Sequence, residues 1–135
     1  MSAQAEANKQ LILDYFDAWA QGDVERAEAY WSDDFIGFQA GHSTLAGTYH
    51  GPKDFHERWI TRTLELTGGR WTVDHADVIL AGEDGIVVMA YEWMERDGKG
   101  RIDTEKLVVY TIGDGKIRSC RMYDGDQGAI DDFYA

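Results

Sequence analysis

The sequence has 135 residues, a length typical of one domain, and 44% of them are hydrophobic. We expect a single folded domain over residues 1–135, because this much apolar side chain supports one core and excludes a disordered chain. The formal net charge of −12 repels phosphate backbones and anionic lipid, which argues against nucleic acid and membrane surfaces as partners. The apolar runs are too short to span a bilayer, and no apolar signal core opens the chain. Because the single cysteine, Cys120, cannot form an internal disulfide, we expect a cytoplasmic protein.

The first half of the sequence predicts three helices. Between Ala5 and Ala20, apolar residues recur at the spacing of an amphipathic helix. Residues 21–23 then supply a glycine stop and an aspartate N-cap, and a short second helix is expected over residues 24–31. Pro52, a residue favoured in the first turn, begins a third helix that ends at Gly68.

The remaining segments read mostly as strands. A short strand is expected over residues 35–40, and residues 41–51 are read as a loop. A final helical turn is expected over residues 126–134. Four long strands separated by Gly and Asp turns predict an antiparallel meander, with bounds at 70–81, 86–96, 102–112 and 116–123. Because helices come first and strands follow, the pattern indicates an α+β domain.

Several motifs of known chemistry are absent from the sequence. No Gly-x-x-x-x-Gly-Lys-Ser/Thr loop is present to bind nucleotide phosphates, and no Gly-x-Ser-x-Gly turn indicates a serine hydrolase. None of the four histidines is paired at the i, i+4 spacing of a helical zinc site, and one cysteine cannot complete a thiolate site. We therefore expect neither a metal nor a cofactor.

Four segments, taken in order, carry a family resemblance. They are Tyr15-Phe-Asp-Ala-Trp-Ala-Gln-Gly-Asp-Val, Tyr30-Trp-Ser-Asp-Asp-Phe, Leu45-Ala-Gly-Thr-Tyr-His-Gly and Asp114-Gly-Lys-Ile. With them the chain resembles the nuclear transport factor 2-like superfamily, and most closely its SnoaL-like branch. The resemblance implies a cone-shaped half-barrel, in which a curved antiparallel sheet wraps around the three N-terminal helices and encloses an apolar pocket. It implies no single activity, because relatives include ketosteroid isomerases, polyketide cyclases, epoxide hydrolases and non-catalytic binding proteins.

The resemblance carries over only one residue of the known catalytic sets. Tyr15 matches the tyrosine that donates to the oxyanion in ketosteroid isomerases. Gln39 falls near their general-base aspartate, and Val108 falls near their second oxyanion-hole acid. Met122 takes the place of the catalytic aspartate of the polyketide cyclases. Steroid isomerisation by the usual route is therefore not expected.

Strand alternation predicts which residues face the pocket. Successive side chains point to opposite faces, so Cys120, Met122 and Asp124 share one face and are expected to face the cavity. On the neighbouring strands the same reasoning suggests an inner face made by Val88, Ala90, Glu92 and Met94, and then by Lys106, Val108, Tyr110 and Ile112. Glu92 and Lys106 either pair inside the cone or face solvent or a partner subunit, and the second arrangement is favoured because charged pairs are common on outer sheet faces. The candidate ligand-binding residues are Trp19, Phe38, Trp59, Glu92, Val108, Tyr110, Cys120 and Met122.

Three residues are candidates for catalysis, each with a simpler structural interpretation. Tyr15 would donate a hydrogen bond to a developing oxyanion, or it only packs in the core. Asp124 would move a proton if desolvated, or it is a solvated turn residue. His42 would move the proton, because the unperturbed pKa of a histidine side chain, near 6.5, suits proton transfer, or it is an exposed loop histidine.

The leading hypothesis for function is cofactor-independent acid–base chemistry on an apolar, oxygenated small molecule. A polyketide, terpenoid or steroid-like compound is the expected substrate, and isomerisation, cyclisation, hydration or dehydration the expected reaction. The alternative is a non-catalytic small-molecule-binding or dimerisation module. We also expect a homodimer, because Tyr91, Trp93 and their apolar neighbours otherwise leave an exposed patch on the outer sheet face.

Overall fold

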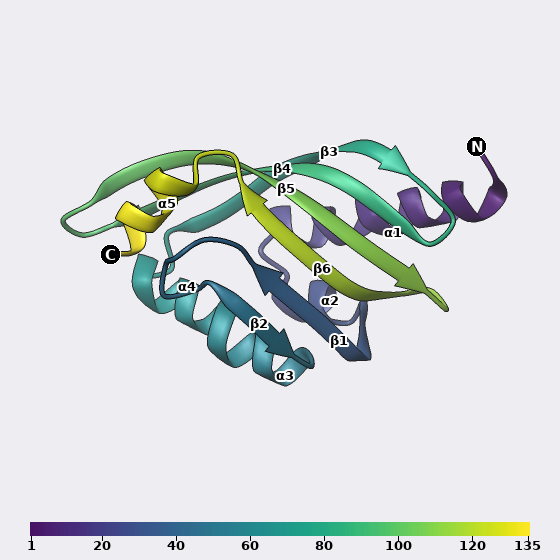
Figure 1. The fold of residues 1–135 in the computed structure, drawn as a ribbon, viewed down its shortest axis with the longest axis horizontal. Coiled ribbons are helices and arrows are strands. Elements are labelled where there is room, and N and C mark those ends of the chain that lie inside the picture. Colours follow the sequence, from purple (N-terminus) through teal and green to yellow (C-terminus); the bar gives the residue numbers. More distant parts are fainter.

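The computed structural model describes all 135 residues and forms one α+β unit (Figure 1). The helices are α1 (Ala3–Ala20), α2 (Val24–Glu28), α3 (Pro52–Phe55), a π-helical turn η1 (His56–Ile60), α4 (Thr61–Thr67) and α5 (Gln127–Tyr134). The strands are β1 (Trp31–Gln39), β2 (Gly47–His50), β3 (Trp71–Ala81), β4 (Gly85–Arg96), β5 (Gly100–Gly113) and β6 (Lys116–Asp124). The segments α3, η1 and α4 follow without interruption and together form the third helix expected from the sequence.

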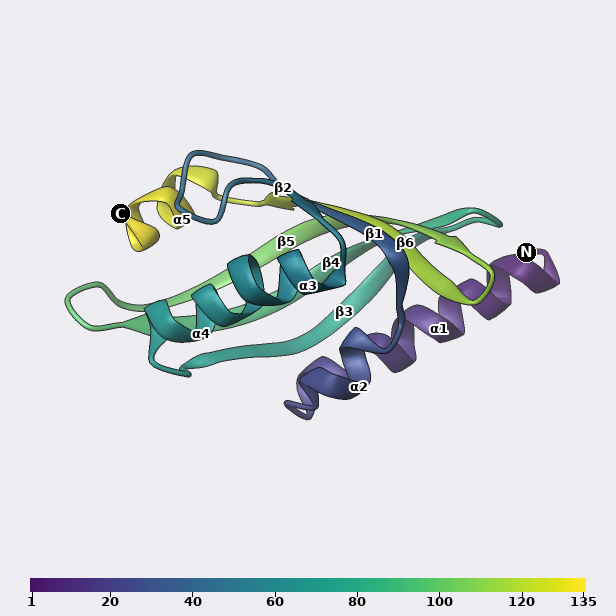
Figure 2. The ribbon, with the colours of Figure 1, turned by 90° about the horizontal axis from the view of Figure 1, so that it is seen from below.

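The six strands form one curved, unclosed sheet in the order β2-β1-β6-β5-β4-β3. Figure 2 shows α1 to α4 beneath one face of this sheet, while α5 lies at one end beside the connection between β1 and β2. The cone-shaped α+β architecture expected from the sequence is therefore confirmed. The sheet is not wholly antiparallel, however, because β1 and β6 pair in parallel. Most of the chain separates these two strands, which gives the long crossover that a parallel pair requires.

Two local boundaries differ from the expectation. Trp31 begins β1 and does not end the second helix, because it pairs with Ile117 of β6 and the carbonyl of Tyr30 accepts from the amide of Ile117. Residues 47–50, expected within a loop, form the edge strand β2, which pairs with β1. Tyr49 accounts for this strand, because its ring is buried and its hydroxyl donates to the carbonyl of Leu45.

The helices bury their apolar faces against the concave side of the sheet. Ile12, Tyr15 and Phe16 of α1 are buried in the main core. Along β4 the burial of side chains alternates as the pleat requires, with Val88, Ala90, Glu92 and Met94 inward. The predicted parity of the long strands is therefore confirmed.

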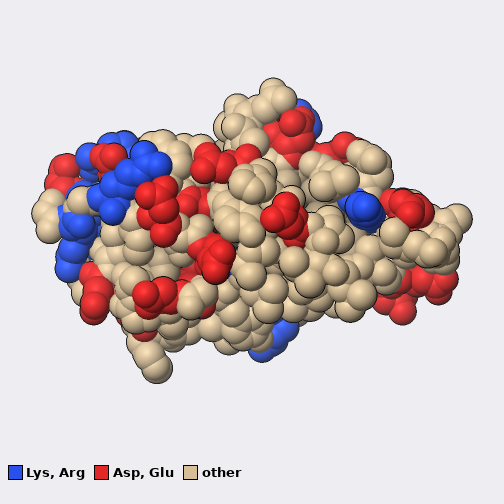
Figure 3. All heavy atoms as spheres, turned by 90° about the horizontal axis from the view of Figure 1, so that it is seen from above, with Lys and Arg blue, Asp and Glu red and all other residues tan.

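Two surface properties bear on possible partners. No helix combines the length and the apolar composition that crossing a membrane requires. Figure 3 shows acidic side chains across the view, with basic side chains gathered mainly at one end.

Candidate functional site

The concave side of the sheet encloses two adjoining cavities. The first, which we call the inner chamber, has a volume of about 40 Å³ and mostly apolar walls. It lies among α1, the third helix and the sheet, and is lined by Tyr15, Phe16, Trp19, Phe55, Trp59, Trp71, Val73, Ala90, Glu92, Lys106, Val108, Tyr110, Cys120 and Met122. Seven of the eight residues predicted to bind ligand line this chamber: Trp19, Trp59, Glu92, Val108, Tyr110, Cys120 and Met122.

The second cavity, which we call the outer chamber, is smaller and more polar. Its volume is about 10 Å³, and it is lined by Gln39, Ser43, Leu45, Trp59, Thr63, Trp71, Glu92, Met94, Lys106, Asp124, Ile130 and Tyr134. Trp59, Trp71, Glu92 and Lys106 line both chambers. These four side chains therefore form a wall shared by the two chambers, and a ligand that extends from one chamber into the other would contact them.

A buried ion pair forms part of this shared wall. The Lys106 Nζ atom lies 3.5 Å from Glu92 Oε1, and the two side chains are 7% and 6% exposed. Glu92 Oε2 also accepts from the indole nitrogen of Trp71 at 3.3 Å. The expectation that this charged pair faces solvent or a partner is wrong, because Ala90 pairs with Lys106 in the β4–β5 register and places the ammonium diagonally beside Glu92 on the inner face.

The positive charge of Lys106 is preserved despite its burial. Desolvation of the ammonium opposes its charge, but the negative charges of Glu92 and Asp124 outweigh this effect, so the pKa of Lys106 is raised. The ammonium also lies 5.0 Å from the centre of the Trp59 ring, where the π face adds a further attraction. The chambers therefore contain one fixed cation.

Asp124 is the second carboxylate of the site and differs from Glu92 in its contacts. It ends β6 opposite Lys106 of β5, and its Oδ2 atom accepts from Gln39 Nε2 at 2.8 Å. Its Oδ1 atom is buried and has no hydrogen-bond partner. Both oxygens of Glu92 are engaged, so Asp124 is the carboxylate with an oxygen free to accept a proton from a ligand. The residue is thus more than a solvated turn residue.

Trp59 is held in the shared wall by packing on several sides. It lies in the π-helical turn, a feature frequent at functional sites, and its ring stacks on Phe55 with centroids 4.8 Å apart. Phe55 in turn lies over Gly37 of β1, where a β-carbon would come within 2.6 Å of the Phe55 ring. The indole nitrogen of Trp59 is buried without a partner.

Tyr15 lines the apolar end of the inner chamber. Its hydroxyl oxygen accepts from Trp31 Nε1 at 3.2 Å, which leaves the hydroxyl proton available to a ligand. Burial raises the pKa of Tyr15, so the phenol stays protonated and keeps its capacity to donate. The structure is therefore compatible with the donor role inferred from the resemblance.

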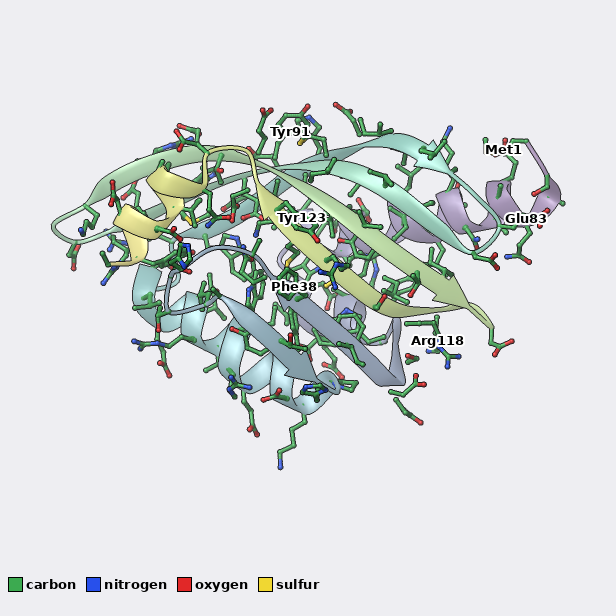
Figure 4. All side chains as sticks on the ribbon, in the orientation of Figure 1. Met1, Phe38, Glu83, Tyr91, Arg118 and Tyr123 are labelled. Carbon is green, nitrogen blue, oxygen red and sulfur yellow. The ribbon has the colours of Figure 1, made fainter.

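Two of the predicted site residues lie outside both chambers. Phe38 lies on the outer face of β1, near Tyr123 of β6 and beneath the guanidinium of Arg121 (Figure 4). Alternation along β1 requires this, because Gln39, its neighbour, faces inward. His42 is exposed in the loop after β1, where its backbone amide donates to Asp131. Neither side chain is placed to touch a ligand in the cone.

Several lining residues were not predicted from the sequence. Trp71 begins β3 and contributes its indole to both chambers. Ile130 and Tyr134 of α5 line the outer chamber, and the Tyr134 hydroxyl donates to the sulfur of Met94 at 3.0 Å. The i, i+4 spacing of Ile130 and Tyr134 in the sequence does indicate an amphipathic helix. It does not indicate which surface of the protein that helix covers.

The helices and the curved sheet define a cone-shaped α+β protein, as the resemblance implies. The SnoaL-like domain model matches residues 12–120, and the chain belongs to this family. An uncharacterized protein of Mycobacterium tuberculosis is 26% identical over 130 residues, which cover 96% of this chain and 98% of the relative.

Solved structures show the same fold. A nuclear transport factor 2-like protein of unknown function from Burkholderia pseudomallei has a TM-score of 0.82 at 16% identity, covering 100% of this chain and 99% of its own. TerC co-crystallized with polyporic acid has a TM-score of 0.79 at 18% identity, covering 95% of this chain and 98% of its own. At these identities the likeness shows the fold alone.

Proposed function

We propose that this protein binds a small, apolar, oxygenated molecule in the cone and transfers a proton on it without a cofactor. Asp124 is the proton-transfer group, and Tyr15 donates a hydrogen bond to the oxygen on which negative charge develops. The observation that carries the proposal is the buried Oδ1 atom of Asp124, which has no protein partner while Gln39 holds the other carboxylate oxygen. A carboxylate fixed in this way is suited to act as a general base.

The remaining polar groups support this chemistry. Lys106 supplies a positive charge inside the cavity that stabilises an anionic intermediate. A protonated Tyr15 in the apolar chamber acts in a low-dielectric site, where a donor to developing charge is worth about 3–4 kcal/mol. His42, being exposed, is left without a part in the reaction.

The chamber volumes limit the size of the substrate. Pockets for drug-sized ligands enclose roughly 300–1,000 Å³, whereas the inner chamber encloses about 40 Å³. A steroid-sized molecule would require a large displacement of the helices. A terpenoid or polyketide fragment of about one ring requires a smaller displacement.

The test is hydrogen–deuterium exchange at carbon. A panel of one-ring ketones and enones is incubated with the protein in D₂O, and NMR reports deuterium entering the position next to the carbonyl. For a compound that exchanges, Asp124→Asn should lower the rate about 100-fold or more, and Tyr15→Phe should lower kcat with little change in KM. Asp33→Asn and Tyr91→Phe, at exposed and outer-face positions, are matched controls that should retain the wild-type rate.

The second candidate is a binding module without catalysis, favoured by the largely apolar walls of the inner chamber. It predicts that ring compounds bind while none of them exchanges. Exchange that survives both Asp124→Asn and Tyr15→Phe within about threefold would contradict the assignment of these two residues.

A further inference from the structure

Only two buried side-chain polar atoms in the structure have no hydrogen-bond partner, Trp59 Nε1 and Asp124 Oδ1. The first is a donor and the second an acceptor, and both residues line the outer chamber. An unpaired buried polar group destabilises the folded protein. Because both residues line this small chamber, a single group placed between them that both accepts and donates would satisfy the two atoms together.

Neither residue is free to turn toward another partner. The Trp59 ring is stacked on Phe55 at 4.8 Å and has the Lys106 ammonium 5.0 Å from its centre. The Asp124 carboxylate is held through its other oxygen by Gln39 Nε2. The donor and the acceptor are therefore preorganised, which lowers the entropic cost of binding a group between them.

The size of the outer chamber restricts what that group can be. Its volume of about 10 Å³ is close to the space that one water-sized group needs. A hydroxyl has this size and has both a donor and an acceptor. An ether or ketone oxygen only accepts hydrogen bonds, so its lone pairs would be repelled by Asp124 Oδ1. An ammonium group only donates, so it would leave the Trp59 N–H unpaired.

We propose that the outer chamber recognises one hydroxyl group of a compound whose apolar body occupies the inner chamber. The hydroxyl oxygen accepts from Trp59 Nε1, and the hydroxyl proton is donated to Asp124 Oδ1. The ligand therefore belongs to the hydroxylated ring compounds, and in a substrate of the proposed reaction this hydroxyl is present in addition to the carbonyl oxygen that faces Tyr15. This inference rests on the proposed function, because it specifies the ligand of the same cavity, but it concerns recognition and needs no turnover.

The test compares three probes of similar size by NMR titration: phenol, toluene and anisole. Phenol donates and accepts, anisole only accepts, and toluene does neither. A hydrogen bond to a charged group contributes about 1.5–3 kcal/mol, so phenol should bind at least about tenfold more tightly than either of the other two. The Trp59 indole N–H resonance, one of five tryptophan signals, is assigned through its contacts with Phe55. Phenol should move this resonance downfield, and toluene should not.

Two variants separate the roles of donor and acceptor. Trp59→Phe should reduce the preference for phenol over toluene at least threefold, with Trp93→Phe on the outer sheet face as the matched control. In Asp124→Asn the amide is able to donate, so the preference for phenol over anisole should fall to about one, while Asp33→Asn keeps it. The wild-type resonance provides a readout that stands even if a variant does not fold.

Equal binding of phenol and toluene, binding of none of the probes, or an unmoved Trp59 resonance would overturn the inference. A phenol preference together with no deuterium exchange on any ketone would support the recognition site and reject the proposed catalysis. Deuterium exchange that depends on Asp124, without any preference for phenol, would support the proposed catalysis and reject the recognition site.

Discussion

Replacing Lys106 by methionine removes the one cation of the two chambers while keeping a side chain of similar length. The Lys106 ammonium lies 3.5 Å from Glu92, with both side chains more than nine-tenths buried. In Lys106→Met, Glu92 and the partly buried Asp124 are left without a compensating cation. Removing one member of a buried ion pair costs about 3–5 kcal/mol, and we expect a loss of free energy of unfolding in this range.

Urea unfolding followed by circular dichroism measures this loss. With a slope near 2 kcal/mol per M, the midpoint should fall by about 2 M. The double variant Glu92→Gln/Lys106→Met removes the unpaired carboxylate and should recover at least about 1.5 kcal/mol of the loss. Lys53→Met is the matched control, because the Lys53 side chain is 87% exposed and its replacement should cost under about 0.5 kcal/mol.

The pH dependence of this loss follows from the raised pKa of Lys106. A group whose pKa is higher in the folded state contributes stability that is complete below its unfolded-state pKa, near 10.4 for lysine. The contribution disappears as the pH rises through the higher folded-state value. The stability difference between wild type and Lys106→Met should therefore be constant from about pH 7 to 9 and shrink above pH 10.4. A difference below about 1 kcal/mol at pH 7, or no coupling to Glu92, would refute this reasoning.

Two further predictions concern the thiol and the outer face. Burial raises the pKa of Cys120 to about 12, so its thiol should be unreactive in the folded protein. Iodoacetamide at pH 8 should modify Cys120 in urea and leave the folded protein unmodified. Rapid modification of the folded protein would contradict the buried placement of this residue. We also predict a homodimer through the outer sheet face, where Tyr91 borders an acidic groove that includes Asp103 and Glu105. Raising salt from about 0.05 to about 0.5 M should tighten the dimer by screening these charges, and light scattering showing only the 15.3 kDa chain at both salt levels would disprove it.

Most of the fold was predictable because its signals are local. Each helix stop, N-cap and hairpin turn is defined by a few consecutive residues, and the meander of β3 to β6 follows from the hairpin turns. The parallel pairing of β1 with β6 has no such signal, because it depends on how distant segments meet. The short strand β2 was missed for a similar reason, since four residues with a single buried side chain give too little alternation to recognise.

The candidate site was predictable where alternation could be applied along a long strand. Val108, Tyr110 and Met122 line the inner chamber because two long strands set their parity. Phe38 was misplaced because the short strand expected around it has too few residues to show which face is buried. The resemblance did place Gln39 near the catalytic position, and alternation puts neighbouring residues on opposite faces. Together these two observations exclude Phe38 from the pocket.

The inward placement of Glu92 and Lys106 could not be decided from residue type. Charged pairs occur more often on the outer faces of sheets, and that frequency favoured the outer face for Glu92 and Lys106. Strand alternation also allowed the inner face, where the structure places them. The unpartnered atoms of Trp59 and Asp124 are beyond any sequence pattern, because whether a polar atom lacks a partner depends on every neighbour around it.

The polar groups inside the cone are difficult to explain by stability alone. A buried ion pair is often matched or exceeded in stability by well-packed apolar residues of similar volume, and the neighbouring side chains Val108, Met122 and Met94 are already apolar. The site adds to the ion pair an unpaired indole donor and an unpaired carboxylate oxygen, each of which lowers stability further. Sequences break local rules mainly at functional positions. The cost borne by this chamber is therefore best accounted for by a ligand that completes its hydrogen bonds, whether or not a proton transfer follows.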